Sequence, residues 1–408
     1  MSPDTSNGPG AGPLPILFTH FGEQWIRGSE TLLLDLLAHL DAARVRPVVW
    51  CNGTEMAEAC RSAGYETYRS DFTYYLDAGS PRFNASAYAA LVREGLALAR
   101  RHSVRVLHAN SAAPLQWLLP VARTLRLPLL AHLHIDYLRR SRYALLVHQA
   151  DLIVGVSRQV LDDFFQDGIP AERTQVIYNG IDFARLDGRP GSDLRPRLGI
   201  PPGTVLVGAA GSLIPRKGHD VLIRAMAVLT GDYGPHLLIA SGGPERETLE
   251  RLTVELGLSA RVHFLGYHDP ITDLYQSCDI MALASRADAF GLVLAEAGYS
   301  HRPVVATMVG GIPEVIEDGV TGFLVPPENP QALAHALARL VADGALRARM
   351  GEAGRLRAET RFSVQRMAAE FGDAYGHLAA LPSAKLGWGN LPGRALPYAR
   401  MFKRRRAG

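Results

Sequence analysis

One carboxylate stands inside an otherwise apolar segment and raises the question of a ligand. The run ADAFGLVLAEAG covers residues 287–298 and carries Glu296 beside Leu292, Val293 and Ala297 on a helix-like pattern. A carboxylate in such surroundings is costly unless it is paired or hydrogen-bonded. The vicinal hydroxyls of a ribose would be suitable partners, and the alternative is a carboxylate satisfied inside the protein core.

The residues just before this helix could meet an anion. Asp288 either caps a helix that begins near Gly291 or contacts a polar ligand. The backbone amides of Phe290, Gly291 and Leu292 would face whatever lies at the helix start, where free N–H groups favour negative charge. This short segment therefore offers donors for a phosphate and an acceptor for a sugar.

A second turn, AAGSLIPRKGHD (residues 209–220), places Arg216 and Lys217 beside another helix start. Cations at a helix N-terminus form an anion site, most often for phosphate. The alternative is a solvated turn with two surface charges. Taken alone, the turn favours this alternative, because it has neither a Walker nor a GxGxxG spacing.

Both segments lie within an alternation of strands and helices. Continuous apolar runs such as RPVVWC, VRVLHAN, HLLIASGG and DIMALAS predict strands buried on both faces of a parallel sheet. Helical spacing recurs at residues 29–40, 84–102, 136–150 and 157–167. The pattern predicts the α/β class with two Rossmann-like, doubly wound domains facing across a cleft, and ligands outside the carboxyl ends of the strands.

The length supports two domains, because 408 residues exceed the roughly 250–300 that one core organises. A Pro- and Gly-rich stretch at 183–203 is typical of a connection between domains. The predicted parts are a lead (1–13), a first domain (14–190), a second domain (191–362), a C-terminal helix (363–385) and a basic tail (386–408).

Charge and cysteine content exclude several classes of protein. The formal net charge is +3, but six cations from Arg394 onward supply it, which leaves about −3 for the rest. A nucleic-acid binder would carry its basic face on the folded body, so no nucleic-acid partner is expected. The 3 cysteines show neither disulfide nor metal-ligand spacing, so no metal site is expected and a reducing compartment is indicated.

No apolar run is long enough for a membrane span, and the first residues do not form a signal peptide. A cytoplasmic protein is therefore expected. The tail YARMFKRRRAG could contact the inner, anionic face of a membrane, where each basic residue contributes about 1 kcal/mol. The alternative is a disordered, solubilising end.

Residues 285–330 resemble the donor-binding half of the family 4 retaining glycosyltransferases, which have the GT-B fold. The family hallmark Glu-x7-Glu corresponds to Asp288 and Glu296, with seven residues between them. The pieces DLIVGVS, VIYNGID, GSLIPRKG and GGIPE follow the family's order, and the likeness covers most of residues 14–380. The resemblance implies the GT-B fold, with a C-terminal helix that crosses back to the first domain.

The resemblance also implies roles in the second half. Glu296 resembles the glutamate that holds the ribose hydroxyls, and Asp288 the residue that contacts the donor sugar or lies near the reaction centre. Lys217 matches the lysine that neutralises the diphosphate. The amides that would meet the phosphate or the transferred sugar are those of Phe290, Gly291 and Leu292.

In the first half, LPLLAHLHIDY (127–137) resembles the strand that ends in a histidine near the sugar, which places His134 there. His132 points the same way in a strand and is interpreted as a core imidazole. Gly28 and Ser29 resemble the turn that approaches the diphosphate, and Ser29 also suits an N-cap.

Three positions depart from the family pattern. Asp288 is one methylene shorter than the usual glutamate, and Arg27 replaces the first glycine of a pair. Ser212 stands where many members have an arginine for the diphosphate, and Arg216 is expected to substitute for it.

The resulting hypothesis is a nucleotide-sugar-dependent, retaining glycosyltransferase that uses no metal or further cofactor. Its expected acceptor is a carbohydrate or lipid-linked hydroxyl, in bacterial polysaccharide, lipopolysaccharide or glycolipid synthesis. The departing phosphate would take the acceptor's proton. Two alternatives stay open: a sugar-nucleotide epimerase of the same architecture, and a nucleotide-binding member that has lost catalysis.

Overall fold

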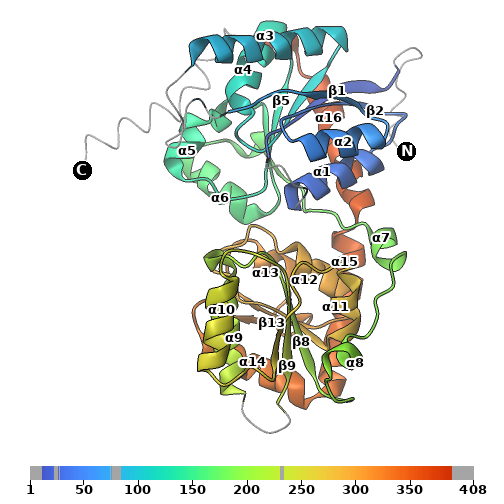
Figure 1. Ribbon diagram of the computed structural model, residues 1–408. Helices are drawn as coiled ribbons and strands as arrows, with labels where there is room; N and C mark the ends of the chain where they lie inside the picture. Colours follow the sequence, from blue (N-terminus) through green and yellow to red (C-terminus); the bar gives the residue numbers. More distant parts are fainter. Residues whose placement is uncertain are drawn as a thin grey trace. The chain divides into compact units, whose positions relative to one another are not determined.

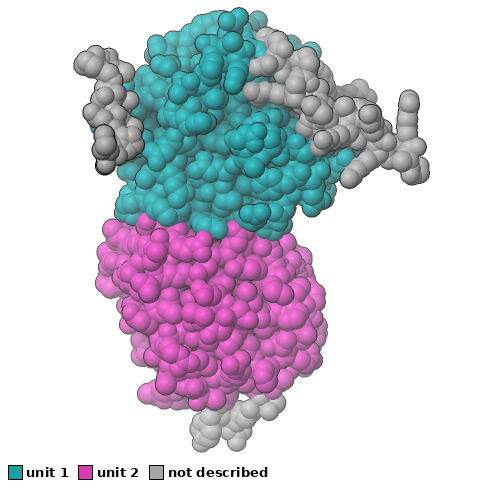
Figure 2. All heavy atoms as spheres, turned by 180° about the vertical axis from the view of Figure 1, so that it is seen from behind, with its two compact units in different colours: residues 1–180, 365–408 teal, residues 181–364 magenta. Residues whose placement is uncertain are grey.

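The computed structural model describes residues 12–22, 26, 28–73, 75, 84–229 and 234–387. The chain divides into two compact units, coloured separately in Figure 2. Unit 1 comprises residues 1–180 and 365–408, and unit 2 comprises residues 181–364. The expected lead and basic tail lie almost entirely outside the described residues.

Unit 1 is built on a parallel sheet with strand order β3-β2-β1-β4-β5-β6-β7. Strands β1, β2, β4, β5 and β6 are largely buried, which explains their continuous apolar character. Its strands are β1 (Leu14–His20), β2 (Val45–Cys51), β3 (Glu66–Arg69), β4 (Val106–Asn110), β5 (Leu129–Leu133), β6 (Leu152–Gly155) and β7 (Thr174–Val176).

Helices connect these strands (Figure 1). They are α1 (Gly28–His39), α2 (Thr54–Ser62), α3 (Ala85–Arg101), α4 (Leu115–Leu125), α5 (Arg139–Ala144) and α6 (Arg158–Asp167), with 3-10 turns η1 (Val147–Gln149) and η2 (Ala171–Arg173). The predicted helix at 136–150 is shorter than expected, because Leu146 adopts a left-handed backbone (φ 61°) that separates α5 from η1.

Unit 2 repeats the plan with a parallel sheet of order β10-β9-β8-β11-β12-β13. Its strands are β8 (Leu206–Ala210), β9 (His236–Ala240), β10 (Val262–Phe264), β11 (Ile280–Leu283), β12 (Val304–Thr307) and β13 (Gly322–Val325). Its helices are α7 (Phe183–Asp187), α8 (Arg195–Leu198), α9 (His219–Val228), α10 (Arg246–Glu255), α11 (Thr272–Ser277), α12 (Leu292–Tyr299), α13 (Ile312–Val315), α14 (Pro330–Ala342) and α15 (Gly344–Arg361), with η3 (Pro215–Lys217). Both sheets therefore confirm the two predicted Rossmann-like domains.

The last long helix, α16 (Val364–Ala379), completes unit 1 although it follows unit 2 in the chain. The ring of Phe371 lies 4.8 Å from that of His132 on β5, and the ring of Tyr375 lies 5.8 Å from that of Phe18 on β1. The expected crossing back of the C-terminal helix is confirmed. After η4 (Ser383–Lys385) the described chain ends at residue 387.

In each sheet the strand order reverses direction at one place, between β1 and β4 in unit 1 and between β8 and β11 in unit 2. Loops leaving the carboxyl ends of such neighbouring strands diverge to opposite faces and open a crevice. No helix among the described residues is long and apolar enough to cross a membrane.

Candidate functional site

In unit 2 the two turns singled out from the sequence meet at the switch point of the sheet. The Nζ atom of Lys217, on the turn after β8, lies 2.6 Å from Oδ2 of Asp288, on the turn after β11. The side chains are 18 % and 12 % exposed, so the pair is largely shielded yet still open to solvent. The N-cap residue of α12 is Gly291, which has no side chain to cap the helix, so the alternative in which Asp288 caps α12 is wrong.

Further contacts join the same two turns. Arg216 donates to the carbonyl of Ala287 at 2.9 Å, and the amide of Arg286 donates to the carbonyl of Arg216 at 2.8 Å. The Arg286 guanidinium forms a bidentate pair with Asp220. Burial alone would raise the pKa of Asp220, but the hydrogen bonds and charge of Arg286 outweigh it and lower that pKa.

Two glycines allow this close approach of backbone segments. A Cβ on Gly218 would lie 2.0 Å from the carbonyl oxygen of Ala284, and one on Gly310 would lie 1.9 Å from that of Asp288. Both glycines also have positive φ angles, 64° and 55°. The GGIPE turn thus fixes the backbone of Asp288, and the amide of Gly311 donates to the Asp288 carbonyl at 2.9 Å.

The start of α12 presents its backbone without side-chain capping. Gly291 has a left-handed backbone (φ 87°), and Leu292 is the first helical residue. Phe290 is buried, and its ring meets that of Phe362 edge-on at 5.4 Å. The predicted anion-binding amides therefore sit on a well-anchored turn, with half-buried Ser212 on the neighbouring turn after β8.

Glu296 is half-buried on α12, and a tyrosine holds it. The hydroxyl of Tyr275, on α11, donates to Oε2 of Glu296 at 2.6 Å. Tyr275 is only 1 % exposed, so burial raises its pKa well above the usual value, and the charge of Glu296 adds to this. The Tyr275 hydroxyl thus orients the carboxylate.

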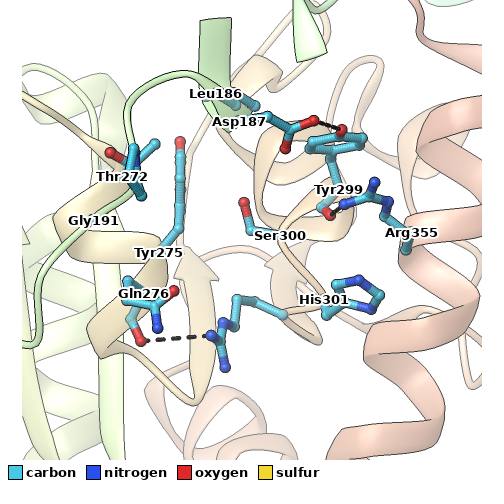
Figure 3. A pocket seen from close by; sticks show the side chains of 12 residues that line it. Leu186, Asp187, Gly191, Thr272, Tyr275, Gln276, Tyr299, Ser300, His301 and Arg355 are labelled. Carbon is cyan, nitrogen blue, oxygen red and sulfur yellow. Dashed lines mark hydrogen bonds between the residues drawn. The ribbon is translucent and has the colours of Figure 1, made fainter. Parts of the chain in front are cut away.

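A separate cavity of about 320 Å³ lies in unit 2, and none of the predicted site residues lines it (Figure 3). Tyr275 reaches its wall, and the hydroxyl of Tyr299 donates to Asp187 at 2.6 Å on another side. Arg355 stacks over the ring of Tyr299 at 3.6 Å.

In unit 1, polar side chains gather at the switch point of that sheet. His20 ends β1, Asn110 ends β4, and the strand register places these two residues directly opposite each other. Asn110 Nδ2 lies 2.9 Å from His20 Nδ1, and Asn110 Oδ1 lies 2.8 Å from His134 Nε2. On the other side, His20 Nε2 lies 2.9 Å from Oε1 of Glu30 on α1.

This network joins two residues predicted from the sequence. Ser29 donates to Oε2 of Glu30 at 3.1 Å, so Ser29 and His134 are the two ends of one chain of hydrogen bonds. Ser29 lies inside α1, which begins at Gly28, so it is not an N-cap as expected. Gly28 is exposed at that helix start, and Arg27 lies outside the described residues.

His132 is 3 % exposed and has no hydrogen-bond partner on either ring nitrogen within the described part of the chain. Its ring lies 4.1 Å from that of His134 and 5.5 Å from that of His108. Burial lowers the pKa of His132 well below its usual value and lowers those of His108 and His134 to about 3. All three imidazoles are therefore neutral at ordinary pH.

Several of these residues were missed from the sequence. Tyr275, Arg286 and Asp220 support the unit 2 site, and His20, Glu30 and Asn110 form the unit 1 network. His20 and Asn110 could have been found from the sequence, because each is a polar residue at the end of an apolar strand. No local pattern indicates that Tyr275 contacts Glu296.

Chemically, unit 2 offers a cation and uncapped amides on turns that contact each other, and an oriented carboxylate further along α12. The cation and the amides can bind a phosphate, and the carboxylate can accept hydrogen bonds from hydroxyl groups. Unit 1 offers the neutral imidazole of His134, which a hydrogen bond to Asn110 holds in place.

The two halves of the chain match two family models. Residues 26–185 match Glycosyltransferase Family 4, and residues 192–357 match Glycosyl transferases group 1. The chain is 36% identical over 251 residues to a D-inositol 3-phosphate glycosyltransferase of Corynebacterium glutamicum, covering 58% of this chain and 59% of that protein. It is 30% identical over 230 residues to the N-acetyl-alpha-D-glucosaminyl L-malate synthase of Bacillus anthracis, covering 56% of this chain and 60% of the relative. The chain thus spans less than two thirds of the length of these curated relatives.

Among solved structures, HepE of Anabaena in complex with UDP is similar over 89% of this chain and 100% of that chain. The TM-score is 0.77 and the sequence identity 26%. This likeness agrees with the two doubly wound sheets and shows the GT-B architecture. With one family model on each half of a GT-B fold, the chain belongs to the family 4 glycosyltransferases.

Proposed function

We propose that the protein transfers a sugar from a nucleoside-diphosphate sugar to an acceptor hydroxyl with retention of the anomeric configuration. The observation that carries the proposal is the Lys217–Asp288 pair at the switch point of unit 2, beside the uncapped start of α12 and the oriented Glu296. The HepE structures with UDP and with UDP-glucose support a nucleotide sugar as the ligand class.

In this proposal Lys217 stabilises the negative charge that builds on the departing diphosphate. An ammonium group has three donors, so Lys217 can keep its bond to Asp288 and still donate to phosphate oxygens. Charge stabilisation by such a preset donor acts mainly in the transition state. Arg216 adds a second cation on the same turn, so the proposal requires no metal.

Glu296 would accept hydrogen bonds from the ribose hydroxyls, oriented by Tyr275. The amides of Phe290, Gly291 and Leu292 would meet the phosphate or the transferred sugar. The departing phosphate would take the proton of the acceptor, which we propose to be a carbohydrate or lipid-linked hydroxyl in polysaccharide, lipopolysaccharide or glycolipid synthesis. The proposed location is the cytoplasm.

The test is a donor screen with the UDP, GDP and ADP forms of glucose in buffer containing EDTA. A ligand at a hundredfold excess over its Kd should stabilise the fold by about 2.7 kcal/mol, which thermal unfolding detects. The bound donor should then release its nucleoside diphosphate, and the sugar first released to water should keep the donor's anomeric configuration.

Other outcomes would overturn the proposal in distinct ways. Conversion of the donor into an epimeric nucleotide sugar without release of nucleoside diphosphate would identify an epimerase. Binding without turnover, with water or a panel of sugar acceptors, would identify a member that has lost catalysis.

A further inference from the structure

The hydrogen-bond chain of unit 1 runs from Ser29 through Glu30, His20 and Asn110 to His134. Each link lies between 2.8 and 3.1 Å, which is normal hydrogen-bond length. A histidine nitrogen can donate or accept according to its tautomer, so the chemistry of the two ends decides the direction of every bond.

Glu30 sets that direction at one end. Burial by itself would raise the pKa of Glu30, but hydrogen bonds, first among them the one from His20, outweigh burial, so the pKa is lowered and Glu30 is a carboxylate. A carboxylate only accepts, so His20 must carry a proton on Nε2. Asn110 directs its Nδ2 amide at His20 Nδ1, and because that amide can only donate, His20 Nδ1 must be the acceptor.

Asn110 links the tautomer of His20 to that of His134. Because its amide nitrogen is turned toward His20, its Oδ1 atom faces His134 Nε2 and can only accept. His134 must therefore carry its proton on Nε2 and leave Nδ1 unprotonated. The Nδ1 atom is buried and has no hydrogen-bond partner within the described residues.

The residues around Gly22 hold the Glu30–His20 part of this chain in place. A Cβ on Gly22 would lie 2.3 Å from Oε1 of Glu30 and 2.4 Å from Nε2 of His20, so only a glycine fits against their hydrogen bond. Asn52 fixes the Gly22 backbone from both sides, accepting from its amide at 2.9 Å and donating to its carbonyl at 2.8 Å.

We propose that Glu30, His20 and Asn110 are positioning residues that hold His134 in the Nε2–H tautomer with one fixed ring orientation. His134 Nδ1 then carries only a lone pair, which can accept a hydrogen bond but cannot donate one to a phosphate oxygen. Because this nitrogen is buried, a hydroxyl of a sugar can reach it only if the side chains around it move. This sugar contact rests on the proposed function, whereas the tautomer itself does not.

The tautomer is measured directly by ¹⁵N NMR of the histidine-labelled full-length chain without any substrate. Protonated and unprotonated ring nitrogens have well-separated shifts, and comparison with a His134→Gln variant assigns the signals. We expect His134 and His20 each to show a single Nε2–H form. A protonated Nδ1 on His134 in the unaltered protein would overturn the proposal.

Glu30→Gln tests the cause. A glutamine amide can present either its oxygen or its nitrogen to His20, so the bias toward one tautomer disappears while side-chain size is kept. We expect the Nε2–H signal of His134 to be lost or split. The matched control is Glu94→Gln, because Glu94 accepts a hydrogen bond from Ser70 in the same unit, away from this chain.

Asn110→Asp provides the conservative variant. Its carboxylate still accepts from His134 Nε2, so His134 should keep its tautomer while His20 takes up a second proton. If Glu30→Gln left the His134 signals unchanged, or Asn110→Asp removed the Nε2–H form, the chain would not set the tautomer.

Kinetics separate this proposal from the proposed function. With an accepted donor, Glu30→Gln should lower kcat on the order of 10-fold to 100-fold, the range seen when a partner that orients a functional histidine is lost. The KM for the donor should change little. An unchanged kcat in a transferring enzyme would overturn the positioning role, whereas a correct tautomer without any transfer would overturn only the proposed function.

Discussion

Lys217 is the side chain on which the proposed chemistry depends most directly. Its ammonium group is held by Asp288, and the two side chains are only 18 % and 12 % exposed, so removing it leaves a largely shielded carboxylate without its cation and should lower the stability of the fold. The same removal should raise the free energy of the transition state, because the Lys217 ammonium group no longer stabilises the charge on the departing diphosphate.

Lys217→Ala should therefore lower kcat by about 10²–10³, the loss typical of one preset charge-stabilising donor. Its unfolding temperature should fall, so turnover is compared at a temperature at which both proteins are folded. Lys385→Ala, which changes a lysine of unit 1 in η4, is the control and should keep full turnover. Near-normal rates for Lys217→Ala with an accepted donor would contradict the assignment.

Tyr275 offers a second test, because its only polar atom holds Glu296. A hydrogen bond to a charged group contributes about 1.5–3 kcal/mol, so Tyr275→Phe should weaken nucleotide binding about 10-fold or more. Isothermal titration with the accepted nucleoside diphosphate measures the change. Tyr299→Phe removes an equally short bond to Asp187 in the same unit and should leave the affinity unchanged.

The turns between strands and helices carry both candidate sites, and glycine sets how closely they can approach. At Gly310 the backbone of the GGIPE turn touches that of Asp288, where no Cβ can fit. Gly319, on the same side of β13 in the sequence, also has a positive φ angle, but a Cβ there would meet nothing. A comparison of Gly310 with Gly319 therefore distinguishes the cost of backbone strain from the cost of a steric clash.

Gly319→Ala should cost about 1 kcal/mol from its left-handed backbone alone. Gly310→Ala should cost about 1–3 kcal/mol more, because the turn must also move away from Asp288. Urea unfolding measures both, and only Gly310→Ala should also weaken nucleotide binding. Equal losses of stability in the two variants would mean that the turn can move away from Asp288 at little cost.

Most helices and strands could be predicted because their buried residues form a clear apolar pattern in the sequence. In unit 2 the strands β8, β9, β11 and β12 are runs buried on both faces, and the apolar runs HLLIASGG and DIMALAS predicted β9 and β11. The edge strand β3 was missed, because ETYR is only partly buried and has no apolar run.

The site was predicted only where a motif spans a few residues. Asp288, Glu296 and Lys217 each belong to a local motif, but their partners depend on register and on loops that meet in space. Tyr275 and Glu296 belong to different helices. His20 and Asn110 end two different strands, and His134 follows a third. No pattern within one segment encodes such contacts.

Buried histidines give unit 1 a particular response to acid. The folded-state pKa values of His108 and His134 are about 3, and that of His132 is well below its usual 6.5. Their neutral forms stabilise the fold fully above about pH 6.5. As pH falls from 6.5 toward 3, the unfolded chain binds protons that the folded chain does not, so stability decreases.

Each such histidine can contribute up to about 1.4 kcal/mol per pH unit within that window. His132→Phe removes one titrating ring and two unpaired nitrogens beside Phe371, so it should flatten the fall of unfolding temperature between pH 6.5 and 5. His335→Phe, at an exposed position, is the control. An unchanged slope for His132→Phe would show that His132 is already protonated or hydrated in the fold.

The crossing of α16 has a consequence for how the protein is made. Unit 2 is continuous in sequence, whereas the sheet of unit 1 is covered by a helix that follows unit 2. Domains fold during synthesis as their residues emerge, at about 5–20 residues per second. On the ribosome, the nascent first sheet must therefore wait with Phe18 and His108 unprotected until the whole second unit has been translated.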